Sequence, residues 1–229
     1  MLTVQDIADM IDHSLLRPEL TRGEIQAGCR VAQEQRCVSV CARPADVTLC
    51  AQELARSAVL VTTVVGFPHG SSTMATKLFE ARAALQDGAR ELDMVLNIGR
   101  LRSGELEYVE EEIRALVGAA HAAGALLKVI LENAYLSLDQ KVSACLISER
   151  AGADFVKTST GFAPSGSTLE DLRLMRATCS PRVRIKAAGG VRTLDDALAV
   201  RAAGASRFGA TQTVAILEEA RRRAAEGRL

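Results

Sequence analysis

The sequence predicts a single (β/α)8 barrel, because short apolar stretches alternate with amphipathic stretches along the whole chain. A second observation is a recurring Gly-Ala pair, found in "DGAREL", "AGALLKV", "AGADFVK" and "AGASRFG". Each pair follows a helix-like stretch and precedes an apolar run, and glycine fits the left-handed position at a helix end. Eight such units within 229 residues are close to the smallest barrel of this type. An open doubly wound sheet is the alternative.

Each element can be placed from these patterns. We expect strands at residues 11–15, 37–41, 59–65, 91–96, 126–131, 154–159, 183–188 and 206–210. We expect helices at residues 21–36, 44–57, 72–87, 103–123, 137–151, 168–178, 193–203 and 212–226. A hydroxyl residue followed by an acid or amide marks helix starts in "LTRGE", "LSLDQ", "STLED" and "RTLDD". No linker interrupts the pattern, so we expect residues 1–229 to form one domain.

The overall composition is that of an ordinary globular protein. Apolar residues make up 48% and charged residues 24%, and 28 basic residues balance 28 acidic ones. A neutral chain gives no reason to expect nucleic acid or an anionic membrane as a partner. No apolar run reaches the roughly 18 residues of a membrane span, and the N-terminus lacks the basic stretch of a secretory signal. Six cysteines without a CxxC pair fit reduced thiols, so we expect a cytoplasmic protein.

Lysine is rare in this chain and lies where a charge is least expected. Of the 28 basic residues, 23 are arginine and five are lysine. Three lysines fall inside apolar, strand-like runs: Lys128 in "LLKVILE", Lys157 in "DFVKTST" and Lys186 in "VRIKAAGG". Lysine, unlike arginine, can lose its proton and form an imine. These lysines are therefore either structural residues paired with acids or a source of a reactive amine.

Charged residues near the ends of the strands are the candidates for catalysis, because barrel enzymes have their active sites there. Asp93, in "ELDMVLN", joins the three lysines as a residue expected to point into the barrel. Burial and a second ammonium both lower the pKa of a lysine. Lys186 would thus activate Lys157 to attack a carbonyl, and Asp93 would assist proton transfer. In the alternative, both lysines stay charged and bind anions.

Glycine-rich loops follow the last three expected strands. "TSTGF" follows Lys157, "AAGGVR" follows Lys186, and "RFGAT" ends the last strand. Backbone N–H groups in such loops bind anions, and barrels often bind phosphate after strands seven and eight. The sequence therefore predicts a phosphate site beside the lysines.

The histidines and cysteines give weaker signals. His13, His69 and His121 are far apart and lack ligand spacing, so we expect no metal site. His121, late in a helix, is expected at the surface, and His13 and His69 lie at strand ends. Cys41 also lies at a strand end, and is either a packed apolar residue or a pocket residue that reacts with aldehydes.

Taken together, these motifs resemble the deoxyribose-phosphate aldolase family, class I aldolases with a (β/α)8 fold. The resemblance covers nearly the whole chain, through "IDHSLLRP", "VVGFPHG", "TKLFEARAALQDGARELDMVLNIGRLRSGE", "LLKVILE", "ADFVKTSTGF", "IKAAGGVRT" and "RFGAT" in the family's order. It implies the reversible cleavage of 2-deoxy-D-ribose 5-phosphate to acetaldehyde and D-glyceraldehyde 3-phosphate, in deoxyribonucleotide catabolism. It implies no cofactor and no metal, and suggests a homodimer or homotetramer acting on a phosphosugar and aldehydes.

The resemblance also implies roles for individual residues. Lys157 would form the Schiff base, Lys186 would tune its pKa and exchange protons, and Asp93 would relay protons. The implied substrate- or phosphate-binding residues are Thr160, Gly161, Gly189, Gly190, Gly209 and Thr211. The implied supporting residues are Lys128, Asp12 and Cys41.

The chain departs from the family's pattern at several positions, and two alternatives remain open. Asn133 stands where threonine is common in the family. The C-terminal stretch "RRRAAEGRL" lacks the tyrosine of some members, and we expect the lack of this tyrosine to affect the rate and not the reaction type. One alternative is a Schiff-base aldolase for a different phosphosugar. The other is a non-catalytic sugar-phosphate-binding barrel, which needs the glycine loops but no reactive amine.

Overall fold

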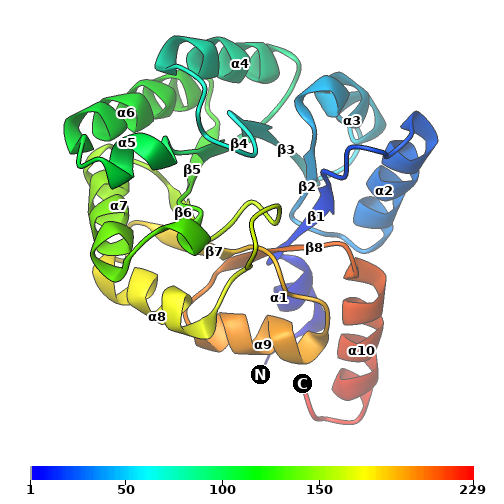
Figure 1. The fold of residues 1–229 in the computed structure, drawn as a ribbon. Helices are drawn as coiled ribbons and strands as arrows, with labels where there is room; N and C mark the ends of the chain where they lie inside the picture. Colours follow the sequence, from blue (N-terminus) through cyan, green and yellow to red (C-terminus); the bar gives the residue numbers. More distant parts are fainter. Residues whose placement is uncertain (1) are drawn as a thin grey trace.

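The strands form one closed barrel. The computed structural model describes residues 2–229, and its eight parallel strands follow one another around the barrel in chain order, as the sequence predicts (Figure 1). The strands are β1 (Ile11–Leu15), β2 (Ser39–Ala42), β3 (Leu60–Val65), β4 (Glu91–Val95), β5 (Leu126–Ile130), β6 (Phe155–Lys157), β7 (Arg184–Ala187) and β8 (Arg207–Ala210). Pairing of β8 with β1 closes the barrel and excludes the open sheet. Every strand begins and ends within two residues of its expected position.

Helices surround the strands as a ring, which Figure 1 shows end-on. They are α1 (Val4–Ala8), α2 (Arg22–Glu34), α3 (Val47–Glu53), α4 (Met74–Gln86), α5 (Ile98–Arg102), α6 (Leu106–Ala122), α7 (Leu138–Arg150), α8 (Leu169–Thr178), α9 (Leu194–Ala202) and α10 (Thr213–Ala225). Short 3₁₀ turns occupy Pro44–Asp46 and Asn133–Tyr135. Among residues 2–229, no helix has the length and apolar character needed to cross a membrane.

Three helical segments differ from the expected ones. Helix α1 precedes the first strand and packs against α10, and the sequence pattern did not predict it. The helix expected at 103–123 is α6, which begins three residues later than expected because Gly104 has a φ of 79° that no right-handed helix contains, and the separate α5 before it was not predicted. The helix expected at 44–57 is a 3₁₀ turn followed by the shorter α3.

Local signals explain where the other helices begin and end. The four expected hydroxyl residues are N-caps that accept a backbone hydrogen bond in the first turn: Thr21, Ser137, Thr168 and Thr193. The glycines of the four Gly-Ala pairs all have positive φ: Gly88, Gly124, Gly152 and Gly204. Both signals are therefore confirmed, and each helix returns the chain to the face where the next strand begins.

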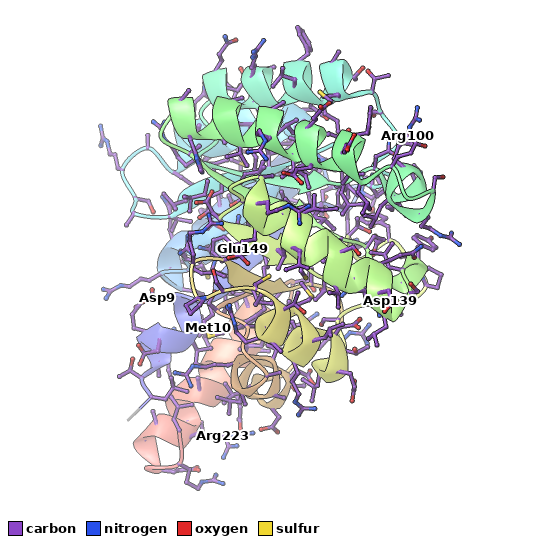
Figure 2. All side chains as sticks on the ribbon, turned by 90° about the vertical axis from the view of Figure 1, so that its left-hand side faces the viewer. Asp9, Met10, Arg100, Asp139, Glu149 and Arg223 are labelled. Carbon is purple, nitrogen blue, oxygen red and sulfur yellow. The ribbon has the colours of Figure 1, made fainter. Side chains whose placement is uncertain are left out.

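The two faces of the barrel differ in what they contain. Figure 2 shows the molecule from the side, with Arg100 and Asp139 at the face where the strands end and Met10 and Glu149 at the opposite face. The apolar core lies between the strands and the helices. The interior of the barrel holds buried charged residues instead, and these residues extend to the face where the strands end.

Candidate active site

Strand register brings the predicted charged residues together. Asp93 of β4 is the register partner of Lys128 of β5, and Lys157 of β6 is the register partner of Lys186 of β7. All four side chains are buried, and Lys157 is the most exposed of them at 3%. Because alternate side chains of a barrel strand point inward, these four meet inside the barrel.

Asp93 lies between the three lysines. Its Oδ2 accepts hydrogen bonds from the Nζ of Lys157 and the Nζ of Lys186, both at 2.7 Å. Its Oδ1 accepts a hydrogen bond from Lys128 Nζ at 2.9 Å. Lys186 Nζ also forms an ion pair with Oδ2 of Asp12 in β1. Lys157 and Lys186 therefore share one carboxylate oxygen, but only Lys186 of the two has a second carboxylate.

The two lysines consequently differ in pKa. Burial lowers the pKa of Lys157, and the ammonium of Lys186 lowers it further, against the opposing attraction of Asp93. Burial also acts to lower the pKa of Lys186, but the carboxylates of Asp12 and Asp93 outweigh it and raise this pKa. The pKa of Asp93 lies well below its usual range, because the three lysines outweigh its burial. Lys157 is thus the amine that loses its proton more readily.

Further ionic groups lie towards the start of the strands. Arg207 of β8 donates from Nε to Asp12 Oδ1 and from Nη2 to Glu91 Oε2, each at 2.8 Å. Glu91 Oε2 also accepts from Lys128 Nζ at 2.5 Å. We call the seven connected side chains the barrel cluster: Asp12, Glu91, Asp93, Lys128, Lys157, Lys186 and Arg207. Four basic and three acidic groups balance when one lysine is neutral.

A pocket of about 340 Å³ opens from the barrel cluster at the face where the strands end. The glycine loops form one side of it, through Thr160, Gly161, Gly189, Gly190, Gly209 and Thr211. Gly189 has a φ of 81°, and a Cβ there would lie 2.9 Å from the Cα of Gly166. Glycine at 189 therefore lets the loop after β7 pack directly on the loop after β6, with the backbone of both near the pocket.

Ten of the twelve predicted site residues line this pocket, and the other two, Asp93 and Lys128, are buried in the barrel cluster. Cys41 is among the ten, and burial raises the pKa of its thiol to about 11. A thiol with so high a pKa is a poor nucleophile at neutral pH. The geometry thus favours Cys41 as a packed pocket residue.

The histidines lie elsewhere. His69 lines a separate pocket of about 440 Å³ beside α4, and not the one that contains the lysines. The Nδ1 of His13 is 2.8 Å from the hydroxyl of Thr213, so this side chain points out of the barrel towards α10. His121 is partly exposed on α6, as expected, and its Nε2 is 2.9 Å from Asp154.

Several residues of the site were missed in the sequence. Glu91 and Arg207 complete the barrel cluster, and Arg17 and Arg192 line the pocket. Glu91 lies two residues before Asp93, so the alternation of a barrel strand gave a signal that could have found it. Arg17 and Arg192 lie inside the motifs "IDHSLLRP" and "IKAAGGVRT", but arginine is too common in this chain to stand out.

Known proteins resemble this chain in sequence and in structure. Residues 7–216 match the model of the DeoC/LacD family of aldolases. A deoxyribose-phosphate aldolase of Clostridium perfringens is 50% identical over 214 residues, which cover 93% of this chain and 95% of that protein. One from a Thermoanaerobacter species is 50% identical over 215 residues, covering 93% of this chain and 96% of the relative.

A solved structure extends the comparison to the fold. The deoxyribose phosphate aldolase of Aeropyrum pernix, described as a unique tetramer, is 32% identical with a TM-score of 0.89. The match covers 95% of this chain and 92% of that one. The family model, the relatives and the barrel agree with the resemblance seen in the motifs. The chain belongs to the DeoC/LacD family of aldolases.

Proposed function

We propose that this protein is a class I aldolase that reversibly cleaves 2-deoxy-D-ribose 5-phosphate to acetaldehyde and D-glyceraldehyde 3-phosphate. Relatives that are about half identical carry the name of this activity. The observation that carries the proposal is the pair of buried lysines on one carboxylate oxygen, one with a lowered and one with a raised pKa. That asymmetry suits one nucleophile and one proton donor.

Lys157 is the proposed nucleophile. Its neutral amine attacks C1 of the open-chain sugar, which gives a carbinolamine. Loss of water from the carbinolamine needs a proton donor, and Lys186, which remains an ammonium, supplies it. Asp93 is hydrogen-bonded to both amines at 2.7 Å, which supports a role in passing protons between them.

Cleavage then follows from the iminium on Lys157. The C3 hydroxyl loses its proton and becomes an aldehyde as the C2–C3 bond breaks. The electron pair of that bond forms the C1–C2 double bond of an enamine, because the iminium accepts electrons, and glyceraldehyde 3-phosphate leaves. Protonation at C2 and hydrolysis release acetaldehyde and restore the amine.

The glycine loops are the proposed phosphate site. Lys157, Gly189, Gly190 and Gly209 line one pocket, and Gly189 and Gly190 have the positive φ that suits anion binding by backbone N–H groups. Arg192 adds a cation to the same wall. When the phosphate is bound there, the C1 carbonyl, at the opposite end of the sugar, lies next to Lys157.

We further propose that residues 1–229 act as one catalytic domain within a cytoplasmic homo-oligomer. The tetramer described for the Aeropyrum pernix relative supports the assembly. All six cysteines are free and buried, which suits a reducing compartment. No cofactor or metal has a part in the proposed mechanism.

The proposal is tested by measuring acetaldehyde release from 2-deoxy-D-ribose 5-phosphate. We expect the parent protein to turn over and Lys157→Arg to lose at least about 10³-fold in rate, because charge is kept and the nucleophile is lost. Lys141→Arg is the matched control, since Lys141 pairs with Asp171 on the outer helices. Turnover retained in Lys157→Arg, at an unchanged melting temperature, would sink the mechanism.

A further inference from the structure

Glu132 is a buried glutamate in an unusual backbone conformation next to the pocket. It lies two residues beyond the end of β5 and is 1% exposed. Its φ of 54° and ψ of 64° are left-handed. Within residues 2–229 it shares a positive φ with only one other non-glycine residue, Arg36. A large side chain in this region is strained, so other contacts must hold it there.

The backbone on both sides of Glu132 shows what holds it. The N–H of Leu131 donates to Lys157 O at 2.9 Å, and the N–H of Asn133 donates to Thr158 O at 3.0 Å. The chain after β5 thus stays paired with the last residue of β6 and the residue that follows it, one bond on either side of the left-handed residue. The turn between these two bonds directs the Glu132 side chain towards the loop that follows Lys157.

In that loop Glu132 contacts Thr160 twice. Its Oε2 accepts the N–H of Thr160 at 3.2 Å and also the Thr160 hydroxyl. The Thr160 oxygen in turn accepts the N–H of Phe162 at 3.0 Å. A carboxylate only accepts hydrogen bonds, so the proton of the Thr160 hydroxyl points at Glu132. One lone pair of the hydroxyl remains, and Thr160 lines the pocket.

We propose that Glu132 is a positioning residue that makes Thr160 an obligate hydrogen-bond acceptor towards the substrate. This inference rests on the proposed function and adds a rule of specificity to it. A carbonyl oxygen cannot donate to Thr160, whereas a substrate hydroxyl can. In the synthetic direction, the partner is the hydroxyl next to the carbonyl of glyceraldehyde 3-phosphate. The pair of Glu132 and Thr160 therefore selects acceptor aldehydes that carry that hydroxyl.

A purely structural role does not account for the glutamate. Within the described chain, its Oε1 is buried and has no hydrogen-bond partner. A glycine would fit the left-handed turn without strain and would leave no such oxygen. The strained backbone and the unpaired Oε1 are both explained when the carboxylate fixes a hydroxyl that the reaction uses.

The test compares two acceptor aldehydes that differ in one hydroxyl. Rates of aldol addition of acetaldehyde are measured with D-glyceraldehyde 3-phosphate and with 3-oxopropyl phosphate, which lacks only the hydroxyl next to the carbonyl. We expect the parent to have a higher kcat/KM for the hydroxylated acceptor. Glu132→Gly removes the carboxylate and suits the left-handed backbone. We expect this variant to reduce the preference about tenfold, because kcat/KM falls for the hydroxylated acceptor and does not change for the other acceptor. Glu132→Gln is the matched control that keeps an acceptor oxygen and most of the preference.

A second pair of variants tests Thr160 without disturbing Glu132. Thr160→Val should reduce the preference as Glu132→Gly does, Thr160→Ser should keep it, and the double variant should lose no more than either single one. Equal losses with both acceptors, or no preference in the parent, would overturn the inference. Trapping of acetaldehyde on the enzyme with borohydride is measured alongside. An absent adduct in the parent refutes the proposed function, whereas an adduct without hydroxyl preference refutes only the role of Glu132.

Discussion

Lys157 and Lys186 are the same residue type, but their surroundings shift their pKa values in opposite directions. They are register partners on adjacent strands, are both buried, and share Asp93 Oδ2 at the same distance. The difference is Asp12, which forms an ion pair with Lys186. The sequence predicted both lysines and Asp93, since rare lysines in apolar strands stand out. It could not predict which lysine Asp12 would pair with, because that depends on barrel closure.

Replacing Lys186 tests this division of roles. In Lys186→Met the ammonium that lowers the pKa of Lys157 is gone, and Asp93 Oδ2 is left to Lys157, so the pKa of Lys157 should rise. We expect the rate at neutral pH to fall about 10²-fold or more, with the acid limb of the pH–rate profile moved to higher pH. Steady-state rates across pH, with melting temperature as the control for folding, would measure both effects. A profile that keeps its shape and position would count against the tuning role.

At the scale of elements, the sequence predicted most helices and strands because each has local signals at its ends. Helix α1 escaped because it is only five residues long and precedes the βα alternation. Helix α5 escaped because it too is only five residues long and lies in the connection between β4 and α6. Glu132 escaped because its left-handed turn is imposed by pairing with the last residue of β6 and the residue that follows it, which no local pattern reports.

Alternation along β1 gives a prediction for stability. His13 points outward to Thr213 of α10, and burial lowers its pKa to about 4. An unfolded histidine has a pKa of about 6.5, so between these values the unfolded chain binds the proton and the folded chain does not. The free energy of unfolding should therefore fall as the pH drops from about 6.5 to 4, by up to about 3 kcal/mol from His13 alone.

The variant His13→Gln isolates this contribution, since glutamine can still bond Thr213 but does not titrate. Urea unfolding at pH 7.5 and at pH 4.5 would be compared for the parent and the variant. We expect the parent to lose more stability than His13→Gln on acidification. An equal loss in the two proteins would show that His13 is protonated as easily when folded as when unfolded.

The whole molecule is organised around charge inside the barrel. Seven ionic side chains form one connected cluster, and their charges balance when Lys157 is a free amine. The fold and the lysines could be predicted from alternation and rarity. The charge balance of the barrel cluster could not be predicted, because Arg207 is one of 23 arginines and only the closed barrel distinguishes it from those on the surface.

Arg207 should therefore matter to the stability of the whole barrel. It holds Asp12 and Glu91, and Arg207→Met would leave two buried carboxylates short of positive charge. Breaking a buried ion pair from one side typically costs about 3–5 kcal/mol, and we expect a loss of that order in the free energy of unfolding. Denaturant unfolding would measure it. Arg222→Ala is the control, since Arg222 is exposed and paired within α10, and it should change the free energy of unfolding little. An equally small effect of Arg207→Met would contradict the claim that Arg207 balances the buried carboxylates.

Trapping with borohydride tests whether Lys157 is the nucleophile. The protein is incubated with acetaldehyde and sodium borohydride, which reduces an iminium to a stable amine, and its intact mass and peptide map are measured. We expect one ethyl group per chain, on the peptide that contains Lys157. No adduct, or an adduct on Lys186 or Lys128 in its place, would contradict the assignment of Lys157.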